Sequence, residues 1–540
     1  MKLNNKFFAV AVSTLCLLTV GCNNKPKQSS VPEEENYNIV RPAFTPDYDN
    51  YGVSEKPSGV NMTYYSNIYS RGFSWLTDEN TQGTELYLVK SDKGAEADFS
   101  KAEVISGKSL LCTYDKSGNI VAEGLEAAKG SGNTGEVKVM SHKVHVENLE
   151  KGKAYSYKIG SPSGYYYGAF IVEKEKASSI TAIQVSDAQT KDLSKHSVWR
   201  NTIAKAVDKA GSDLDMIIHN GDQFDQNNSS GNDKEPFRLF RYSKAIDVIQ
   251  DYKFNVAYMT SSGNHEPSSP YSHYLMSDIN YAGYDYKGAY YSYDYDFAHF
   301  VVLNTNTIND EQINWLKSDL DKASNAKWKV VTMHISPYST GDHSNKSENQ
   351  NIVEKLTPIF SSKHVDLVLQ AHDHTYNKTL PYKWDAAGYT ETPHDETTVN
   401  FNATKEAVNN VTYDVNPNGT YYVTTGAAGH RCGASESDGV WAEVVKEDGE
   451  IKGLNPSKTF TTNKYKIEVG TLTQANQYES YKIGSYTSAQ DYKVGDPATG
   501  NVNAQMFGVL NMSESTLSYH VYTVNEQTVK LFDTLDVMKK

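Results

Sequence analysis

Hydrophobic and polar positions change their pattern along the chain near Lys174. From about Tyr51 to Lys174, short runs such as "GFSWLT", "ELYLVK" and "YYYGAFIVE" alternate apolar and polar residues or are rich in aromatic residues, and turn residues separate them. Such runs predict the strands of a β-sandwich. After Lys174, apolar runs alternate with helical stretches. This second pattern predicts an α/β layered domain.

Two segments of the second part predict particular elements. The stretch "DEQINWLKSDLDKA" after Asn309 places Ile313, Leu316 and Leu320 on one helical face and has acidic residues in its first turn, so we expect a helix that packs on a sheet. The tyrosine-rich stretch "YDYKGAYYSYDYDFAHF" predicts a hairpin with stacked cross-strand pairs.

Five apolar runs of the second part end in polar residues of metal-ligand type. In chain order these residues are Asp187 and Gln189, Asp222 and Asp225, Asn264 and His265, His334, and His372 and His374. The loops at the carboxyl ends of strands in α/β sheets are where ligands bind, because backbone groups there are free. Because all five runs end in such residues, we predict that these side chains meet at one site.

Each of these residues taken singly also has a plain structural interpretation. Residues 221–222 and 263–264 are good turn dipeptides, His334 alone is more often a core histidine, and Asp187 after a serine would cap a helix. The histidine pair at 372 and 374 would equally be solvated at a sheet edge. Only the coincidence of all five runs, in this order and after buried strands, favours a common site.

The ordered set "SDAQ … NGDQFD … GNHE … MH … AHDH" resembles the calcineurin-like metallophosphoesterases. The block "HFVVLNTN … QINWLKSDL … WKVVTMHISPY" and the preceding β-sandwich are similar to the purple acid phosphatase-like branch, and "SHKVHVENLEKGKAYSYKIG" is similar to the end of a fibronectin type III-like domain. The resemblance continues in "YYVTTGAAG" and "FGVLNMSESTLSYHVYTV". It implies an α/β fold class: a four-layer α/β/β/α metallophosphoesterase sandwich preceded by a small all-β sandwich domain.

Pattern and resemblance together predict four parts of the chain. They are a lipoprotein signal peptide at 1–21, a flexible tether at 22–50, a fibronectin type III-like β-sandwich at 51–175, and a metallophosphoesterase catalytic domain at 176–540. Residues about 430–500 match nothing in the family and are expected to be an insertion.

The family implies two metal ions and assigns ligands to each. Asp222 would bridge both ions, because a carboxylate has two oxygens to offer. The first ion would be completed by Asp187, His374 and Gln189, which stands where many relatives have histidine; the second would be bound by Asn264, His334 and His372. Asp225 occupies the position of the tyrosine that colours the purple relatives and is a further candidate oxygen ligand. Nitrogen and oxygen ligands without thiolate fit Fe, Mn or Zn.

Two such ions convert a water into hydroxide and clamp a phosphoryl group during in-line displacement, so the resemblance implies hydrolysis of phosphate monoesters. His265 matches the family position that contacts the phosphate or the leaving group, and His343 in "PYSTGDHSN" resembles a second histidine on the substrate side. One alternative is a phosphodiesterase or a nucleotide-directed hydrolase. A second is a surface binding protein that uses its 39 tyrosines to hold a partner and keeps a vestigial metal site.

The N-terminus predicts export to the cell envelope. It has two lysines and then an apolar run from Phe7 to Val20, which is too short to cross a bilayer comfortably and has the size of a signal-peptide core. The motif "LTVGC" resembles a bacterial lipobox, in which Cys22 would be acylated, although Thr19 stands where an aliphatic residue is usual. We expect a lipid-anchored protein on the outer membrane or the periplasmic face; an ordinary cleaved signal is the alternative.

The net charge and the cysteine content bear on nucleic-acid binding and on disulfide formation. The formal net charge of −14 argues against a protein that wraps nucleic acid, because phosphate contacts need a basic surface. Besides Cys22 and one cysteine in the signal peptide, the chain has Cys112 and Cys432. We expect two isolated buried thiols rather than a disulfide.

Overall fold

The computed structural model describes most of the chain from Tyr37 onward. The described residues are 37–48, 53–81, 83–114, 120–122, 138–173, 179–190, 195–224, 238–266, 276–285, 288–338, 343, 346–374, 376–379, 381, 383, 404–429, 444–447, 450–454, 478–481, 505–525 and 527–540. The predicted signal peptide, most of the predicted tether and most of the predicted insertion at 430–500 lie outside them, as do Asp225 and Cys432. Residues 37–540 belong to one unit by their contacts. In the described part of the chain, no helix is long and apolar enough to cross a membrane.

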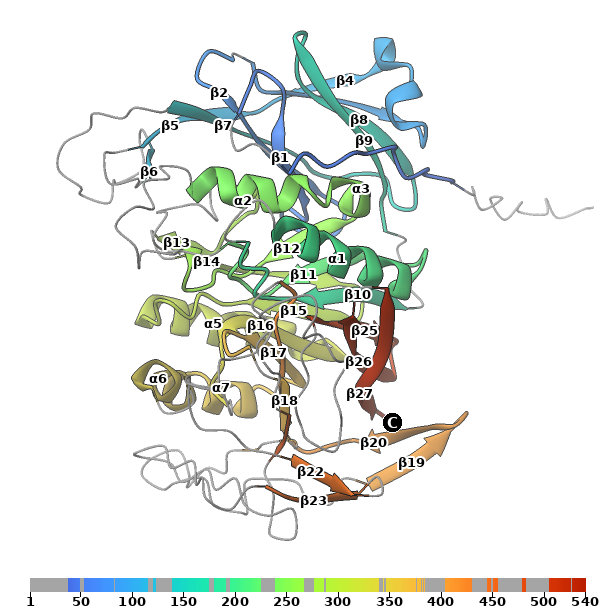
Figure 1. The fold of residues 1–540 in the computed structure, drawn as a ribbon, viewed down its shortest axis with the longest axis vertical. Coiled ribbons are helices and arrows are strands. Elements are labelled where there is room, and N and C mark those ends of the chain that lie inside the picture. The colour runs from blue at the N-terminus through green and yellow to red at the C-terminus, as the bar shows by residue number, and fades with distance from the viewer. Residues whose placement is uncertain are drawn as a thin grey trace, which may run out of the picture. The chain divides into compact units, whose positions relative to one another are not determined.

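Two antiparallel sheets form the N-terminal part, as the alternating pattern predicts (Figure 1). The first sheet has the order β1 (Ser58–Thr63), β2 (Arg71–Asp78), β7 (Lys138–Val146), β5 (Lys108–Tyr114) and β6 (Ile120–Ala122). The second sheet has the order β4 (Glu103–Ser106), β3 (Glu85–Lys90), β8 (Ala154–Ser161) and β9 (Gly164–Ile171). Two short helices, η1 (Gly94–Glu96) and η2 (Phe99–Lys101), follow β3 in the chain. One hydrophobic cluster takes Trp75 from the first sheet and Leu88 and Tyr157 from the second. The two sheets therefore pack on each other as a sandwich.

Hydrogen bonds from strand β1 join the N-terminal sandwich to the α/β part. Ser58 Oγ and the Gly59 backbone N–H donate to the carboxylate of Asp247 at the end of α2 (Arg238–Asp247), at 2.8 and 2.5 Å. Thr63 Oγ1 donates to the Asp278 carbonyl at 2.6 Å. Because these groups are largely buried, breaking the junction would leave polar atoms without partners, which costs about 1–3 kcal/mol for each.

The α/β part contains two eight-stranded sheets. The first has the order β12 (Ala257–Thr260), β11 (Met216–His219), β10 (Ile180–Val185), β25 (Gln505–Met512), β26 (Thr516–Asn525), β27 (Thr528–Met538), β20 (Val411–Val415) and β19 (Thr404–Val408). The second has the order β13 (Gly283–Asp285), β14 (Gly288–Tyr295), β15 (Ala298–Val302), β16 (Trp328–Ile335), β17 (Leu367–Ala371), β21 (Tyr421–Thr425), β18 (Tyr376–Thr379) and β24 (Tyr478–Tyr481). A separate pair is β22 (Val444–Glu447) and β23 (Glu450–Leu454).

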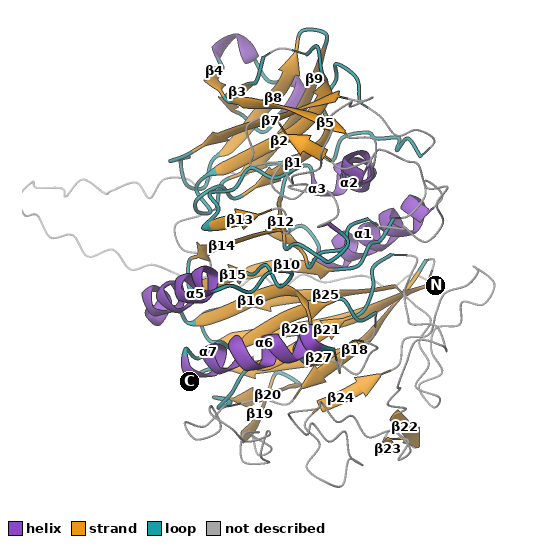
Figure 2. Ribbon diagram, turned by 90° about the vertical axis from the view of Figure 1, so that its left-hand side faces the viewer, coloured by secondary structure: helices purple, strands orange, loops and turns teal. Residues whose placement is uncertain are grey.

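Helices cover the outer faces of both sheets, which gives four layers (Figure 2). The helices against the first sheet are α1 (His196–Ala210), α2 and α3 (Gln250–Lys253); those against the second are α5 (Asp310–Lys322), α6 (Ser347–Lys355) and α7 (Thr357–Ser362), with the short helix η5 (Ala323–Asn325) after α5. Strand β10 shows why the layers form, because successive side chains point to opposite faces. Ala182 faces the second sheet, whereas Ile183 packs with Trp199 of α1.

Several local predictions are confirmed. Helix α5 begins after Asn309, whose side chain accepts a hydrogen bond from Gln312 N, and it buries Leu316 and Leu320 against the sheet. The tyrosine-rich stretch forms the antiparallel strands β13, β14 and β15, and Tyr293 stacks on Phe300 directly across β14 and β15, with ring centroids 5.1 Å apart. Cys112 is a free, buried thiol, and burial raises its pKa to about 12.

The strand directions bring the predicted site loops to one edge of each sheet. Strands β10, β11 and β12 are parallel in the first sheet, and β15, β16, β17 and β21 are parallel in the second. The side chain of Asn220, directly after β11, crosses between the sheets and donates to the carbonyls of Met333 and Leu369 at 3.0 and 2.7 Å. The carboxyl ends of the two parallel groups of strands therefore meet.

Candidate metal centre

Asp222 lies at the middle of a buried group of predicted ligands. Its Oδ2 is 3.3 Å from Nε2 of His334 and 3.6 Å from Nε2 of His265, and it accepts a hydrogen bond from the Gln189 side-chain amide at 3.0 Å. One carboxylate oxygen of Asp222 and one ring nitrogen each of His334 and His372 lie within 4.8 Å of one another. The Asp222 side chain is 1% exposed, so these contacts are shielded from water.

Further contacts join the other predicted ligands. His374 Nε2 is 3.5 Å from Asp187 Oδ1, and the His372 backbone N–H donates to Asp187 Oδ2 at 3.3 Å. Asn264 Oδ1 is 2.8 Å from His334 Nε2. The structure thus brings together Asp187, Gln189, Asp222, Asn264, His334, His372 and His374. Asp225, the eighth predicted ligand, lies outside the described residues.

Several buried polar atoms in this group fit a cation. Asp187 Oδ1, Gln189 Oε1 and His372 Nε2 are buried, and none of them makes a hydrogen bond within the described part of the chain. Asp187 Oδ1 and His372 Nε2 have only longer ionic contacts, with His374 at 3.5 Å and with Glu348 at 3.6 Å. Such atoms are costly unless something satisfies them. The donors are carboxylate oxygen, amide oxygen and imidazole nitrogen, which suit Fe, Mn or Zn. The residues therefore fit a metal centre, and the assignment of each ligand to an ion stays a prediction.

The charges of the centre depend strongly on one another. Burial by itself raises the pKa of Asp222, but the charges of His265 and His334 outweigh burial and hold that pKa well below its usual range. Burial likewise opposes ionisation of Asp187, but the adjoining His374, whose Nε2 lies 3.5 Å from Asp187 Oδ1, lowers the pKa of Asp187. Burial disfavours a charge on His334, yet Asp222 raises its pKa to about 10. In the chain alone, the positive charge of the imidazolium rings thus balances the negative charge of the carboxylates, as a bound cation would.

Backbone conformation places the ligands in a way that sequence patterns do not reveal. Asp187, Gln189, Asp222 and His372 have positive φ values of 50, 38, 56 and 75°. Each non-glycine residue in this left-handed region costs of order 1–3 kcal/mol, and such residues cluster at functional sites. The strain persists because tertiary contacts hold the loops. One such contact joins His334 Nδ1 to the Asn220 carbonyl at 2.7 Å, which orients the imidazole ring.

Glu266 is a site residue that the motif analysis missed. Its side chain is buried, and its two carboxylate oxygens accept hydrogen bonds from the backbone N–H groups of Asp222, Gln223 and Gly263 at 2.9, 2.7 and 2.7 Å. Burial and the charge of Asp222 raise the pKa of Glu266 to about 7. It joins the loop after β11 to the loop after β12. Its place at the end of "GNHE" is the signal that would have found it.

The two predicted substrate-side histidines lie at the mouth of the group. His265 is 20% exposed, and its backbone N–H donates to Asp222 Oδ1 at 2.9 Å. His343 is 24% exposed, its Nδ1 is 2.6 Å from Asp373 Oδ1, and its ring centroid is 3.9 Å from that of His372. Both histidines are therefore next to the predicted ligands and reachable from solvent.

A family model described as calcineurin-like phosphoesterase matches residues 181–376. Acid phosphatase type 7 from Mus musculus is 25% identical over 321 residues, which is 54% of this chain and 65% of that protein. Purple acid phosphatase 21 from Arabidopsis thaliana is 30% identical over 138 residues, 23% of this chain and 31% of that protein. The matched part of the chain thus spans less than two thirds of these relatives.

The fold has a solved counterpart. The purple acid phosphatase PPD1 from yellow lupin seeds (Lupinus luteus) matches with a TM-score of 0.57 and 14% identity, covering 90% of this chain and 75% of that one. At this identity the likeness concerns the fold alone. It agrees with the two sheets and their helical layers, and the predicted fold class is confirmed. The chain therefore contains a calcineurin-like metallophosphoesterase domain with homologues among the purple acid phosphatases.

Proposed function

We propose that the protein hydrolyses phosphate monoesters at a centre of two metal ions. The observation that carries the proposal is the convergence of carboxylate, amide and imidazole groups around Asp222, with buried oxygen and nitrogen atoms that make no hydrogen bond within the described residues. The relatives named acid phosphatases support the same chemistry. The residues that would hold the ions are Asp187, Gln189, Asp222, Asn264, His334, His372 and His374, and Asp225 is a further candidate.

The chain itself would hold and orient the reacting groups. The His265 backbone N–H and the Gln189 amide fix the two oxygens of Asp222, so the carboxylate that would hold the ions is in place before substrate arrives. Two bound ions would lower the pKa of a water and neutralise charge on the phosphoryl group. His265 would donate the proton from Nε2 to the leaving alcohol oxygen. Asp373 holds Nδ1 of His343, which leaves Nε2 for a phosphoryl oxygen.

Hydrolysis of p-nitrophenyl phosphate, with bis(p-nitrophenyl) phosphate as the diester, tests the proposal. Protein loaded with Mn, Fe or Zn should prefer the monoester, and Asp222→Asn should lose both activity and bound metal with unchanged circular dichroism. Asp208→Asn is a matched control, because Asp208 lies on α1 with a side chain 64% exposed. Full turnover and full metal content in Asp222→Asn would refute the two-metal centre, and preference for the diester would favour a phosphodiesterase.

We further propose that acylated Cys22 anchors the protein in the cell envelope, on the outer membrane or the periplasmic face. The proposal rests on the "LTVGC" motif after a short apolar run. A lipid-modified N-terminus gives membrane binding that one exchanged cysteine removes. Cys22→Ala should therefore move the protein from the membrane fraction to the soluble fraction. If that variant stays in the membrane fraction after a salt wash, the lipoprotein interpretation is wrong.

A further inference from the structure

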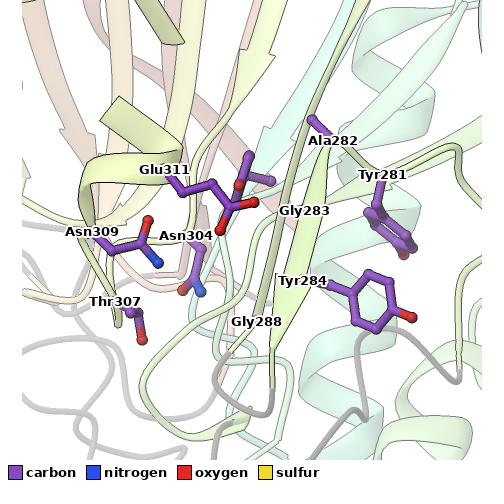
Figure 3. A pocket seen from close by; sticks show the side chains of 10 residues that line it. Tyr281, Ala282, Gly283, Tyr284, Gly288, Asn304, Thr307, Asn309 and Glu311 are labelled. Atoms are coloured by element: carbon purple, nitrogen blue, oxygen red, sulfur yellow. The ribbon is translucent and has the colours of Figure 1, made fainter. Parts of the chain in front are cut away.

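A cavity of about 320 Å³ lies between the β13–β14 hairpin and the segment that joins β15 to α5 (Figure 3). This volume falls in the range of about 300–1,000 Å³ that is usual for small-molecule sites. The cavity is separate from the predicted metal ligands, since none of them lines it.

One wall of the cavity is aromatic. Tyr281 and Tyr284 both line it, with ring centroids 6.1 Å apart and ring planes inclined by 59°. Figure 3 shows their rings on one side and the polar side chains of the other wall across from them. Tyr284 is 45% exposed, so its ring is open to solvent. The wall offers an accessible apolar face to a ligand.

The opposite wall carries hydrogen-bonding groups that the protein leaves unused. Asn304 is 3% exposed; its Oδ1 accepts from the Asn306 N–H at 3.1 Å, and its Nδ2 donates to none of the described residues. Thr307 Oγ1 is buried and has no hydrogen-bond partner in the described part of the chain. Asn309 and Glu311 complete this wall. Thr307 Oγ1, as a buried polar atom without a partner, costs free energy until a ligand satisfies it.

We propose that this cavity binds a neutral sugar ring. A pyranose has an apolar face of C–H groups that packs on a tyrosine ring, and its hydroxyls both donate and accept, so they satisfy Asn304 Nδ2, Thr307 Oγ1 and the Glu311 carboxylate together. A quaternary ammonium ion would suit the tyrosines and Glu311, but it offers Asn304 Nδ2 no acceptor. A phosphate is disfavoured, because Glu311 is acidic and none of the described lining residues is basic.

The cavity shares a loop with the predicted metal centre. Asn306 Nδ2 donates to the Gly263 carbonyl at 2.9 Å, and the Ala289 N–H donates to Ser262 Oγ at 3.3 Å, so both walls touch the loop that leads to Asn264. Asn304 also follows β15, at the same edge of the sheet as His334. A sugar held here would be the alcohol part of the phosphoester. This assignment rests on the proposed hydrolysis, whereas the binding of a sugar does not depend on it.

Saturation-transfer NMR tests the binding without any turnover. The probes are the methyl α-glycosides of glucose, galactose, mannose and N-acetylglucosamine, with choline as the cationic alternative. At least one glycoside should receive saturation from the wild type, and Tyr284→Ala should weaken the binding about tenfold, since removing an aromatic anchor commonly costs over 1 kcal/mol. Tyr167→Ala is the control, because Tyr167 is 38% exposed on β9 and lines no part of the cavity. Equal signals from the wild type and Tyr284→Ala, or transfer to choline alone, would overturn the proposal.

A second measurement separates the sugar site from the catalytic proposal. The KM for the 6-phosphate of the bound sugar should rise about tenfold in Tyr284→Ala, while kcat/KM for methyl phosphate stays unchanged. If glycosides bind and no phosphate ester is hydrolysed, the proposed function fails and the sugar site stands. If esters are hydrolysed and no glycoside binds, the sugar site fails alone.

Discussion

Glu266→Gln should weaken the metal centre without altering any predicted ligand. In the wild type, Oε2 accepts from the N–H groups of Asp222 and Gly263, and Oε1 accepts from Gln223. Glutamine has the same shape but only one acceptor oxygen, so at least one buried N–H must face an amide N–H₂ group. The backbone of Asp222, at φ 56°, then loses part of what holds it in the left-handed region.

The magnitude follows from these three bonds. A hydrogen bond to a charged group contributes about 1.5–3 kcal/mol, and one buried N–H left unsatisfied costs about 1–3 kcal/mol. Losing one of the three bonds should therefore lower the free energy of unfolding by about 2–3 kcal/mol. A shift of the Asp222 carboxylate by about 1 Å would lower kcat on the order of 10²-fold. Altering a residue that orients a ligand also lowers metal affinity, by about 10- to 100-fold.

The assay combines three measurements at pH 8, above the pKa of about 7 of Glu266. Metal affinity by competition with a chelator, kcat on p-nitrophenyl phosphate and urea unfolding should all fall in Glu266→Gln. The control Glu103→Gln changes an exposed glutamate on β4 and should change none of them. A variant that unfolds more easily but keeps wild-type metal affinity and kcat would refute the positioning role and leave Glu266 with a purely structural one.

Three further predictions concern other residues. His265→Ala should slow alkyl or sugar phosphates by about 10²- to 10⁴-fold more than p-nitrophenyl phosphate, since only a poor leaving group needs the proton; equal losses in kcat/KM would remove the acid role. Although burial opposes it, the hydrogen bonds to Asp294 and Asp319 raise the pKa of His299 to about 9. The stability that these bonds contribute is fully present below pH 6.5, the ordinary pKa of histidine, and is lost as pH rises through about 9. His299→Gln should therefore lower the free energy of unfolding in urea by on the order of 3 kcal/mol at pH 6 and by far less at pH 10. Because Asp225 replaces the tyrosine of the purple relatives, iron-loaded protein should show no strong visible charge-transfer band; a purple solution would contradict this.

The sequence by itself determined which residue types gather at the centre. Apolar strands that end in Asp187, Asp222 and His334 were enough to predict a shared edge, because parallel strands of a layered α/β domain must end on the same side. It also determined helix α5 and the tyrosine hairpin, whose periodicities of about 3.6 and 2 residues are local properties of the chain. These predictions needed no knowledge of the contacts between distant segments.

Only the tertiary structure decided how the side chains are held. The pairing of β10 with β25 joins residues about 330 positions apart, and no local pattern encodes it. The left-handed backbone of Asp187 and His372 and the bridge from Glu266 to Asp222 N depend on partners in other loops. The same holds for the cavity beside Tyr284, whose walls come from a hairpin and a separate loop. Patterning fixes which face of an element is buried, whereas the strain and hydrogen bonds of a site are set by the neighbours that folding brings together.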